Sequence, residues 1–539
     1  MPSYTPSLVG AATGVGAHVL LYRQGEWDEK APSIFLSYVF ASILAFASEW
    51  GEGFGVSLPR QWAVHIIFWH VLGVYASMLV YRAFLHPLHN FPGPFSARLS
   101  NLYATLLAAK KLQFYTETEK LHKRFGDYVR LAPTELSITD PEAIVALHGP
   151  QALVSKGPWY TILGDRISLQ LERDKKVHAR RRKVWDRGLN SKSLHLYESR
   201  VAKYASQLVN VIEDHVDTSI DMAKWCNYYA FDVMGDLSFG KSFGMLLNSG
   251  DTFFLNALHA TMKSIGLLGH LVWLFPFFVS TPGLNRENVR FWDRVDAKVK
   301  DRMDNEPESP DVFSWLLENY RNGPKTKQDN LNLRADAFLI VVAGSDTTAA
   351  TLTNLFFHIA TDPGLREQLQ LELDKLSDLS HDNLTQIDLL DAAINETLRL
   401  HPVLPSGTQR QTPPEGLKIG DTYIPGNVNV QIPHYTVFRD ERNFERPTEF
   451  LPSRWTTEPH LIKNKSVFIP FNSGAYTCVG KRLALMELRC VTAQLLSRYD
   501  VSMAPGQSEE AYLDGMRDTF TLMTAPLQLV WRRREGIRA

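Results

Sequence analysis

Hydrophobic positions are distributed unevenly along the chain, and the first ninety residues differ from the rest. Residues 31–48 and 62–81 contain no Asp, Glu, Lys or Arg, and each stretch approaches the roughly 20 residues needed to cross a bilayer. A third stretch, residues 8–22, is shorter and rich in glycine. The pattern predicts two membrane-spanning helices, with the glycine-rich stretch as a weaker third.

Gly10, Gly14 and Gly16 lie in this third stretch with the spacing GxxxGxG. A glycine turn that binds dinucleotides must follow a strand and open a helix, but the preceding residues have no alternating strand pattern. Small residues at four-residue spacing are instead typical of a membrane helix that packs on its neighbour. We interpret these glycines as a packing surface.

A proline-rich segment follows the apolar region. Pro87, Pro92 and Pro94 interrupt any helix and stiffen the chain. This predicts a membrane anchor at 1–86, a proline-rich hinge at 87–94 and a globular body at 95–539. Apolar positions in the body recur mainly with helical spacing, and short β-rich runs occur late, at 417–432 and 519–531. The predicted fold class is mainly α with small β-sheets.

Composition and charge then narrow the function classes. The net charge of −1 over 539 residues gives no indication of a nucleic-acid partner. The three cysteines, Cys226, Cys478 and Cys490, are too scattered for a disulfide framework and include no CxxC pair for zinc. Placing Arg82 and Arg98 on the cytoplasmic side agrees with the positive-inside tendency. The body is therefore predicted to face the reducing cytosol.

Cys478 lies between a glycine-containing loop and an apolar helical stretch. With Phe471, Gly474 and Gly480 it forms the spacing FxxGxxxCxG. A free cysteine often packs as a small hydrophobe, but a cysteine at a helix N-terminus is favoured as a thiolate by the N–H groups and the helix dipole. A thiolate is an axial ligand for haem iron, and the glycines permit a close approach of the backbone to the porphyrin.

At this loop the chain resembles the cytochrome P450 family of haem-thiolate monooxygenases, and the resemblance extends over most of the chain after the proline-rich segment. It implies haem b (iron protoporphyrin IX) as the cofactor, ligated by Cys478. The arginine that usually binds a haem propionate is replaced by Tyr476, whose hydroxyl can donate one hydrogen bond but supplies no charge. By resemblance, other propionate contacts come from the HxxxR pair His178 and Arg182, and from Arg410.

The apolar stretch 335–360 carries the motif AGSDTT at residues 343–348. An unpaired buried carboxylate is costly, so Asp346 needs a partner or a function. A salt bridge for Asp346 and a bond from Thr348 to the preceding helical turn are the structural alternatives. In the family this helix crosses above the haem. The resemblance implies that Asp346 relays protons and that Thr347 holds dioxygen.

Two further motifs imply a structural cluster. Glu396 and Arg399 stand three residues apart in ETLRLHP, and Arg454 lies in FERPTEFLPSRW. An isolated ExxR pair is an ordinary surface ion pair of small energetic value. The resemblance implies instead that the three residues form a Glu–Arg–Arg cluster that maintains the fold near the cysteine loop.

The chain has no nicotinamide or flavin motif, so the resemblance implies a membrane-bound NADPH-cytochrome P450 reductase as the electron donor. Lys481, Arg482 and Arg489, with the basic helix around Arg180, are predicted to form a positive docking surface. Solvated surface charge is the alternative. The implied location is the endoplasmic reticulum membrane, with the catalytic domain in the cytosol.

By resemblance, four segments line the substrate pocket, and most of their side chains are apolar or aromatic. They include Trp159, Tyr160, Ile162, Val403, Leu404, Phe520 and Leu522. Core packing is the alternative, but the set predicts a hydrophobic small-molecule substrate. The sequence resembles fungal members that tailor secondary metabolites such as terpenoids, polyketides and indole alkaloids. A haem-thiolate isomerase or dehydratase that needs no reductase, or a non-catalytic haem-binding protein, remains the alternative function.

Overall fold

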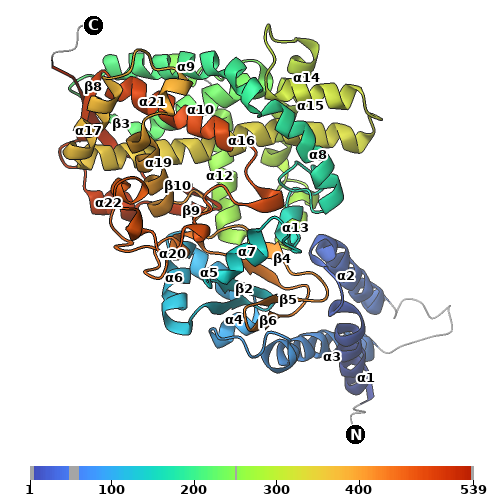
Figure 1. Ribbon diagram of the computed structural model, residues 1–539. Coiled ribbons are helices and arrows are strands. Elements are labelled where there is room, and N and C mark those ends of the chain that lie inside the picture. The colour runs from blue at the N-terminus through green and yellow to red at the C-terminus, as the bar shows by residue number, and fades with distance from the viewer. Residues whose placement is uncertain (1–4, 48–59, 249–251, 536–539) are drawn as a thin grey trace.

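A long buried helix organises the body of the protein. The structure, a computed structural model, describes residues 5–47, 60–248 and 252–535. Helix α16 (Lys327–Thr361) crosses the middle of the helical body (Figure 1), with α10 (Met222–Phe239) packed along it and α21 (Lys481–Leu496) packed on α9 (Ser191–Glu213). The predicted fold class, mainly α with small sheets, is confirmed for the body.

Local sequence signals set the two ends of α16. Thr326 caps its start, because the Thr326 side chain accepts from the backbone N–H of Asp329 and the Asp329 carboxylate accepts from that of Thr326. The helix ends at Thr361, before Pro363, which begins the next helix. Between these ends, a run of small and apolar residues is buried on most sides. Such a helix is a core element that can position side chains precisely.

The remaining helices surround this core. Before α16 the body contains α4 Phe95–Leu99, α5 Leu102–Ala108, α6 Phe114–Phe125, α7 Glu142–His148, α8 Lys175–Gly188, α11 Met245–Asn248, α12 Phe253–Leu268, α13 Leu274–Ser280, α14 Arg286–Asp304 and α15 Val312–Arg321. After α16 it contains α17 Pro363–Leu373, α18 His381–Leu384, α19 Asp388–Leu400, α20 His434–Val437 and α22 Glu509–Asp514.

The described residues of the body also form four small sheets. The largest has the order β1-β2-β7-β4, formed by Tyr128–Ala132, Glu135–Ile138, Asn429–Gln431 and Arg410–Gln411. A second has the order β3-β11-β8, formed by Ser219–Asp221, Gln528–Arg533 and Tyr499–Met503. Two hairpins pair β5 with β6 (Leu417–Ile419, Thr422–Ile424) and β9 with β10 (Arg517–Thr519, Thr521–Met523).

Both predicted β-rich runs form strands, but the sheets also recruit earlier segments that the sequence did not predict. Leu136 of β2 lies opposite Val430 of β7 in parallel register, so residues almost 300 positions apart form one ladder. Strand β3 likewise pairs antiparallel with β11. Such short strands carry a weak local signal because their stability depends on the partner strand.

In the described part of the N-terminal region, three helices lie together at one end of the molecule, beside α13 (Figure 1). They are α1 (Thr5–Ala17), extended by a π-turn at His18–Tyr22, α2 (Ala31–Ala47) and α3 (Arg60–Val80), extended by a π-turn at Tyr81–Leu85. The predicted spans at 8–22, 31–48 and 62–81 therefore coincide with helices, although residues 1–4 and 48–59 of the predicted anchor lie outside the described residues.

The N-terminal helices differ in how well their length and composition suit a membrane span. Among the described residues, Gln61–Leu85 and Lys327–Thr361 are long and apolar enough to cross a membrane. The second of these is α16, which is mostly buried in the body. Of the N-terminal helices, α3 therefore has the strongest signal for a membrane span.

The predicted glycine packing surface is present in α1. A Cβ atom at Gly10 would lie 2.5 Å from the carbonyl oxygen of Ile66 on α3, and one at Gly14 would overlap the carbonyl oxygen of His70. Further along, Nδ1 of His18 lies 2.8 Å from Oγ of Ser77. Because contacts advance in the same direction on both helices, α1 and α3 run parallel. Gly16 differs from the other two, since nothing approaches within 4 Å of a Cβ built there.

The proline-rich segment is fixed against the largest sheet. Leu88 within it is fully buried, and its carbonyl oxygen accepts from the guanidinium of Arg130 on β1 at 3.3 Å. The backbone N–H of Arg130 also donates to the carbonyl oxygen of Pro92 at 2.8 Å. A Cβ at Gly93 would lie 2.6 Å from the Arg130 carbonyl oxygen. The segment predicted as a hinge is therefore packed against β1.

Candidate active site

Cys478 faces a large cavity in the body. Its backbone N–H donates to the carbonyl oxygen of Phe471 at 2.8 Å, which closes the loop just before α21 and its N-cap residue Gly480. The cavity has a volume of about 1390 Å³, and Phe471, Tyr476, Cys478 and Gly480 all line it. Of the three cysteines, all in the described part of the chain, Cys478 alone lines this cavity.

The thiol of Cys478 is exposed to the cavity but lies deep within the protein. Burial raises the pKa of the Cys478 thiol, while the backbone N–H groups of Gly480 and Lys481 and the charge of Arg182 oppose that rise. The helix N-terminus therefore lowers the pKa of the thiol, as predicted, but the effect of burial is larger. A bound metal cation would complete the stabilisation, because a coordinated thiol is deprotonated outright.

The two glycines of the cysteine loop differ in their backbone conformation and in their surroundings. Gly474 adopts φ +64°, and a Cβ there would overlap the carbonyl oxygen of Gly149 and lie 2.8 Å from that of His148, at the end of α7. Close packing of the loop on another part of the protein therefore explains Gly474, whose predicted role was an approach to porphyrin. Gly480 has a conventional φ, and a Cβ built there would lie 4.0 Å from the Cys478 sulfur, an ordinary van der Waals distance.

The residues predicted to contact haem propionates surround Tyr476. The ring of His178 on α8 is edge-on to the Tyr476 ring, with 5.0 Å between the centroids, and the Arg410 guanidinium lies 4.8 Å from the Tyr476 centroid. Arg182 donates to the carbonyl oxygen of Thr477. All four side chains line the cavity. Burial, with nearby positive charges, lowers the pKa of His178 to about 3, so its ring is neutral at physiological pH.

One further cation in this cluster was not predicted there, although it belongs to segment 155–165, which was predicted by resemblance to line the pocket. Lys156 precedes the short helical turn Pro158–Thr161, lines the same cavity and is 4% exposed. Its ammonium lies 5.0 Å from the centroid of Tyr476. Lysine is almost never fully buried unless it is paired. No local pattern marks this position in the sequence, because burial of a single lysine in a loop depends on tertiary contacts.

The AGSDTT motif presents its polar side chains in different directions. Thr347 and Thr348 line the cavity, and the Thr347 hydroxyl donates to the carbonyl oxygen of Ala343 at 2.7 Å. Asp346 does not line the cavity. Its carboxylate lies 3.4 Å from Nε2 of His259 on α12, a partner that the sequence did not predict. Asp346 therefore has a histidine neighbour with which it forms a salt bridge when His259 is protonated.

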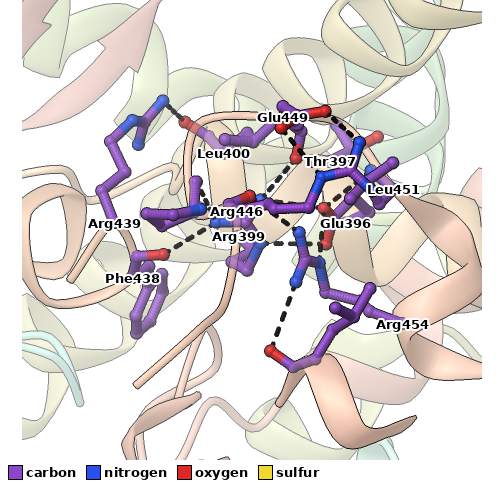
Figure 2. Close-up of polar contacts among 12 residues, drawn as sticks. Glu396, Thr397, Arg399, Leu400, Phe438, Arg439, Arg446, Glu449, Leu451 and Arg454 are labelled. Carbon is purple, nitrogen blue, oxygen red and sulfur yellow. Dashed lines mark hydrogen bonds and ion pairs between the residues drawn. The ribbon is translucent and has the colours of Figure 1, made fainter. Parts of the chain in front are cut away.

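The structure brings Glu396, Arg399 and Arg454 together in one buried cluster (Figure 2). The Glu396 carboxylate accepts from Arg399 at 2.8 and 2.9 Å and from Arg454 at 2.8 Å, and all three side chains have 0% exposure. The indole N–H of Trp455 donates to the same carboxylate at 2.9 Å. Arg399 also donates to three carbonyl oxygens, those of Phe438, Pro447 and Glu449. The cluster therefore connects α19 to the loops that precede the cysteine loop.

Apolar and aromatic side chains form much of the cavity wall. Trp159 stacks on Phe520 with 4.5 Å between ring centroids and an interplanar angle of 18°. Six of the seven residues predicted for the pocket line it, namely Trp159, Tyr160, Ile162, Val403, Leu404 and Phe520. Leu522 does not line it and packs in the core. The sequence missed the contribution of α12, α13 and α14, including Leu258, Phe275 and Phe291.

The basic residues near the cysteine loop differ in their availability. Lys481 and Arg482 are exposed, as is Arg180 on α8. Arg489 is buried, and its guanidinium binds both carboxylate oxygens of Asp391 at 2.6 and 2.8 Å. The prediction that Arg489 contributes to a docking surface is therefore wrong, because its charge is paired inside the protein.

The cavity residues fit haem chemically. They provide one thiol, a cluster of cations for propionates and an apolar wall. Nε of Arg410 and the hydroxyl of Tyr476 are buried without a hydrogen-bond partner in the described chain, although such groups are normally satisfied. The cavity volume of about 1390 Å³ also exceeds the usual range of about 300–1,000 Å³ for one small ligand. There is therefore room for both a prosthetic group and a substrate.

Comparisons with known proteins agree with this geometry. A model of the family "Cytochrome P450" matches residues 92–531. The cytochrome P450 monooxygenase orf5 of Eupenicillium brefeldianum is 48% identical over 471 residues, which cover 87% of this chain and 96% of that protein. The cytochrome P450 monooxygenase FCK2 of Fusarium pseudograminearum is 45% identical over 531 residues, which cover 97% and 96%. Tryprostatin B 6-hydroxylase of Neosartorya fischeri is 33% identical over 476 residues, which cover 86% of each chain. The chain belongs to the cytochrome P450 family of haem-binding monooxygenases.

Proposed function

We propose that the chain oxidises a hydrophobic small molecule in fungal secondary metabolism, using dioxygen and electrons from an NADPH-dependent reductase. The observation that carries this proposal is the single cavity that contains the Cys478 thiol, the Thr347 hydroxyl and an apolar wall. Haem held by Cys478 would supply dioxygen activation, which electron donation from a thiolate favours. A relative at 33% identity is named tryprostatin B 6-hydroxylase, and hydroxylation is the type of oxidation that we propose for this chain.

The side chains of the protein would orient substrate, exclude water and move protons. The stacked pair Trp159 and Phe520 offers a flat apolar surface against which a ring system can pack. We assign proton transfer to Asp346, whose partner His259 is 26% exposed at its side chain and connects the carboxylate to solvent. The Thr347 hydroxyl then provides a hydrogen-bonding group on the cavity side of α16.

The reductase would approach the side of the cysteine loop. Lys481, Arg482 and Arg180 are the exposed members of the predicted basic surface, and Arg482 donates to Ser191 at 2.7 Å. Electrostatic attraction between such a surface and an acidic partner raises the association rate and weakens with salt. The exclusion of Arg489 makes this surface smaller than the sequence predicted.

We also propose a three-span anchor in the endoplasmic reticulum membrane. The connector between α1 and α2 contacts the body, because Glu26 binds the Arg173 guanidinium at 2.7 and 2.8 Å. The end of α3 likewise continues into the body. Since α1 runs parallel to α3, a membrane crossed by α3 would also be crossed by α1, with α2 returning between them. The N-terminus would then lie in the lumen, opposite the catalytic body.

An N-terminal glycosylation acceptor tag tests this topology. Modification of a tag placed before Thr5 is expected for the three-span anchor, because only luminal acceptors are glycosylated. A tag at the C-terminus is the cytosolic control. An unmodified N-terminal tag with intact protein would contradict the three-span arrangement.

The absorbance of the reduced, carbon monoxide-bound protein tests the function directly. A Soret band at the long wavelength that thiolate ligation produces is expected for wild type and should be lost in Cys478→Ser. NADPH oxidation should then require both reductase and a bound hydrophobic substrate. Conversion of an oxygenated substrate without reductase would identify an isomerase or dehydratase, and absence of any turnover with bound haem would favour a haem-binding protein.

A further inference from the structure

Lys156 is a buried ammonium with too few partners. Its side chain donates to the carbonyl oxygen of Leu169 at 3.0 Å, and it forms no ion pair with any carboxylate among the described residues. An ammonium has three donors, and a buried charge without a counterion is costly. Burial, aided by Arg410, holds the pKa of Lys156 well below its usual range. The Lys156 side chain therefore lacks the anionic partner that would stabilise its charged form.

Lys156 lies beside Tyr476 of the cysteine loop, together with a second cationic side chain. The ammonium lies 5.0 Å from the ring centroid of Tyr476, and the Arg410 guanidinium lies 4.8 Å from the same centroid. Nearby carboxylates are already engaged, because Glu172 pairs with Arg181, and Asp336 pairs with Arg181 and accepts from the N–H of Leu169. Two cations thus converge on the one residue of the cysteine loop where the family usually has an arginine.

Tyr476 explains how this cluster forms without an anion in the protein. The faces of aromatic rings attract cations, so a tyrosine can lie next to two buried cationic side chains where an arginine would add a third. The Tyr476 hydroxyl itself has no partner in the described chain. The exchange of arginine for tyrosine and the burial of Lys156 are therefore complementary features of one site.

We propose that Lys156 binds a haem propionate and supplies the positive charge that Tyr476 cannot. This inference rests on the proposed haem-binding function and assigns a specific anion, the propionate carboxylate, to the cavity wall formed by Lys156, Tyr476 and Arg410. It also explains why this chain tolerates tyrosine in the cysteine loop. Lys156 acts on the cofactor by binding it and takes no part in proton transfer.

The test compares haem loss from purified full-length holoenzyme variants to a haem-free myoglobin acceptor. Lys156→Met should raise the rate of haem loss by about tenfold or more, as expected when one partner of a buried charge pair is removed. Lys156→Gln keeps a donor for Leu169 but removes the charge, and it should behave in the same way. Lys192→Met, at an exposed position on α9, is the control and should match wild type.

A compensating substitution separates charge supply from loop structure. Tyr476→Arg combined with Lys156→Met should restore haem retention to within about threefold of wild type, because the charge returns from the neighbouring residue. The haem reduction potential should fall in Lys156→Gln, since loss of a positive charge disfavours the reduced form, and should recover in the double variant.

Three outcomes would overturn the proposal. These are wild-type haem retention in Lys156→Gln, equal haem loss in the single and double variants, and an unchanged reduction potential. The thiolate-type Soret band of the reduced carbon monoxide complex should persist in every variant that retains haem. Its presence with any of these three outcomes would reject the role of Lys156 while leaving the proposed function intact, and its absence from wild type would reject both.

Discussion

The imidazole of His259 lies 3.4 Å from the carboxylate of Asp346, and this contact joins α12 to α16 through two residues that do not line the cavity. Asp346 is 7% exposed, while the adjacent Thr347 lines the cavity. One turn of α16 therefore places an acid and a hydroxyl on different sides of the helix. The partly exposed side chain of His259 thus contacts the buried carboxylate of Asp346.

Substitution of Asp346 by asparagine tests proton transfer. We expect Asp346→Asn to lower the rate of product formation by about a hundredfold, because general acid–base groups typically contribute about 10²–10⁴. Substrate affinity, measured by the substrate-induced absorbance change, should stay constant. Asp382→Asn, at an exposed position on α18, is the control. A wild-type rate in Asp346→Asn would limit Asp346 to its structural contact with His259.

The buried Glu396 cluster predicts a large effect on stability. Glu396→Ala leaves two buried guanidinium groups without their carboxylate and should cost about 3–5 kcal/mol. We expect the purified variant to lack haem absorbance. Asp304→Ala, which removes an exposed partner of Lys300, should retain normal haem content. A fully haem-loaded Glu396→Ala protein would contradict a fold-maintaining role.

Alanine substitutions at two glycines with positive φ distinguish the stability cost of backbone strain from that of steric overlap. Gly506 has φ +86°, and the space around a Cβ built there is open. Gly506→Ala should therefore lower the stability of the fold only by the strain of a left-handed backbone, about 1–2 kcal/mol. Gly474→Ala adds overlap with the Gly149 carbonyl oxygen and should destabilise the protein further. Thermal unfolding followed by haem absorbance provides the measurement. Equal midpoints for the two variants would refute tight packing at Gly474.

Packing of α1 on α3 can be tested with a matched glycine pair. A disulfide between His18→Cys and Ser77→Cys should form in membranes, because these side chains are in contact in the wild type. Gly14→Leu should reduce the cross-linking yield, since its side chain would overlap His70, while Gly16→Leu faces open space and should not. Cleavage between α2 and α3 followed by electrophoresis reports the yield. Equal yields would argue against the glycine packing surface.

The buried carboxyl group of Asp518 should make the stability of the fold depend on pH. Burial raises the pKa of Asp518 to about 6, with the Ser406 hydroxyl opposing that rise. Between about pH 4 and pH 6 the unfolded chain releases this proton first, so the carboxyl group destabilises the fold increasingly as the pH rises, by about 3 kcal/mol at most. Asp518→Asn should therefore raise the unfolding temperature at pH 7.5 relative to wild type.

The same substitution should have little effect near pH 4, where Asp518 is protonated in the folded state and about half protonated in the unfolded state, so most of the destabilisation has not yet set in. Asp304→Asn, at an exposed site, controls for the general effect of charge removal. An equal change in unfolding temperature at both pH values would show that Asp518 does not titrate across this range.

Local sequence determined the elements with strong patterns. The apolar run of α16, its Thr326 cap and the terminating Pro363 are encoded by neighbouring residues, because helix periodicity and capping act over a few positions. The cysteine loop likewise identified Cys478 through its spacing with Gly474 and Gly480. A family resemblance could then assign roles to residues in separate motifs, since those motifs retain their order in the chain.

Only the tertiary structure decided which side chains meet. Lys156 and Arg410 are 254 positions apart in sequence, yet both approach Tyr476. The sequence also assigned Arg489 to the surface, whereas its ion pair with Asp391 is internal. Burial and pairing depend on contacts between distant segments, which propensity and spacing do not encode. The sequence therefore determined the type of chemistry, and the tertiary packing of distant segments decided the partners of these charges.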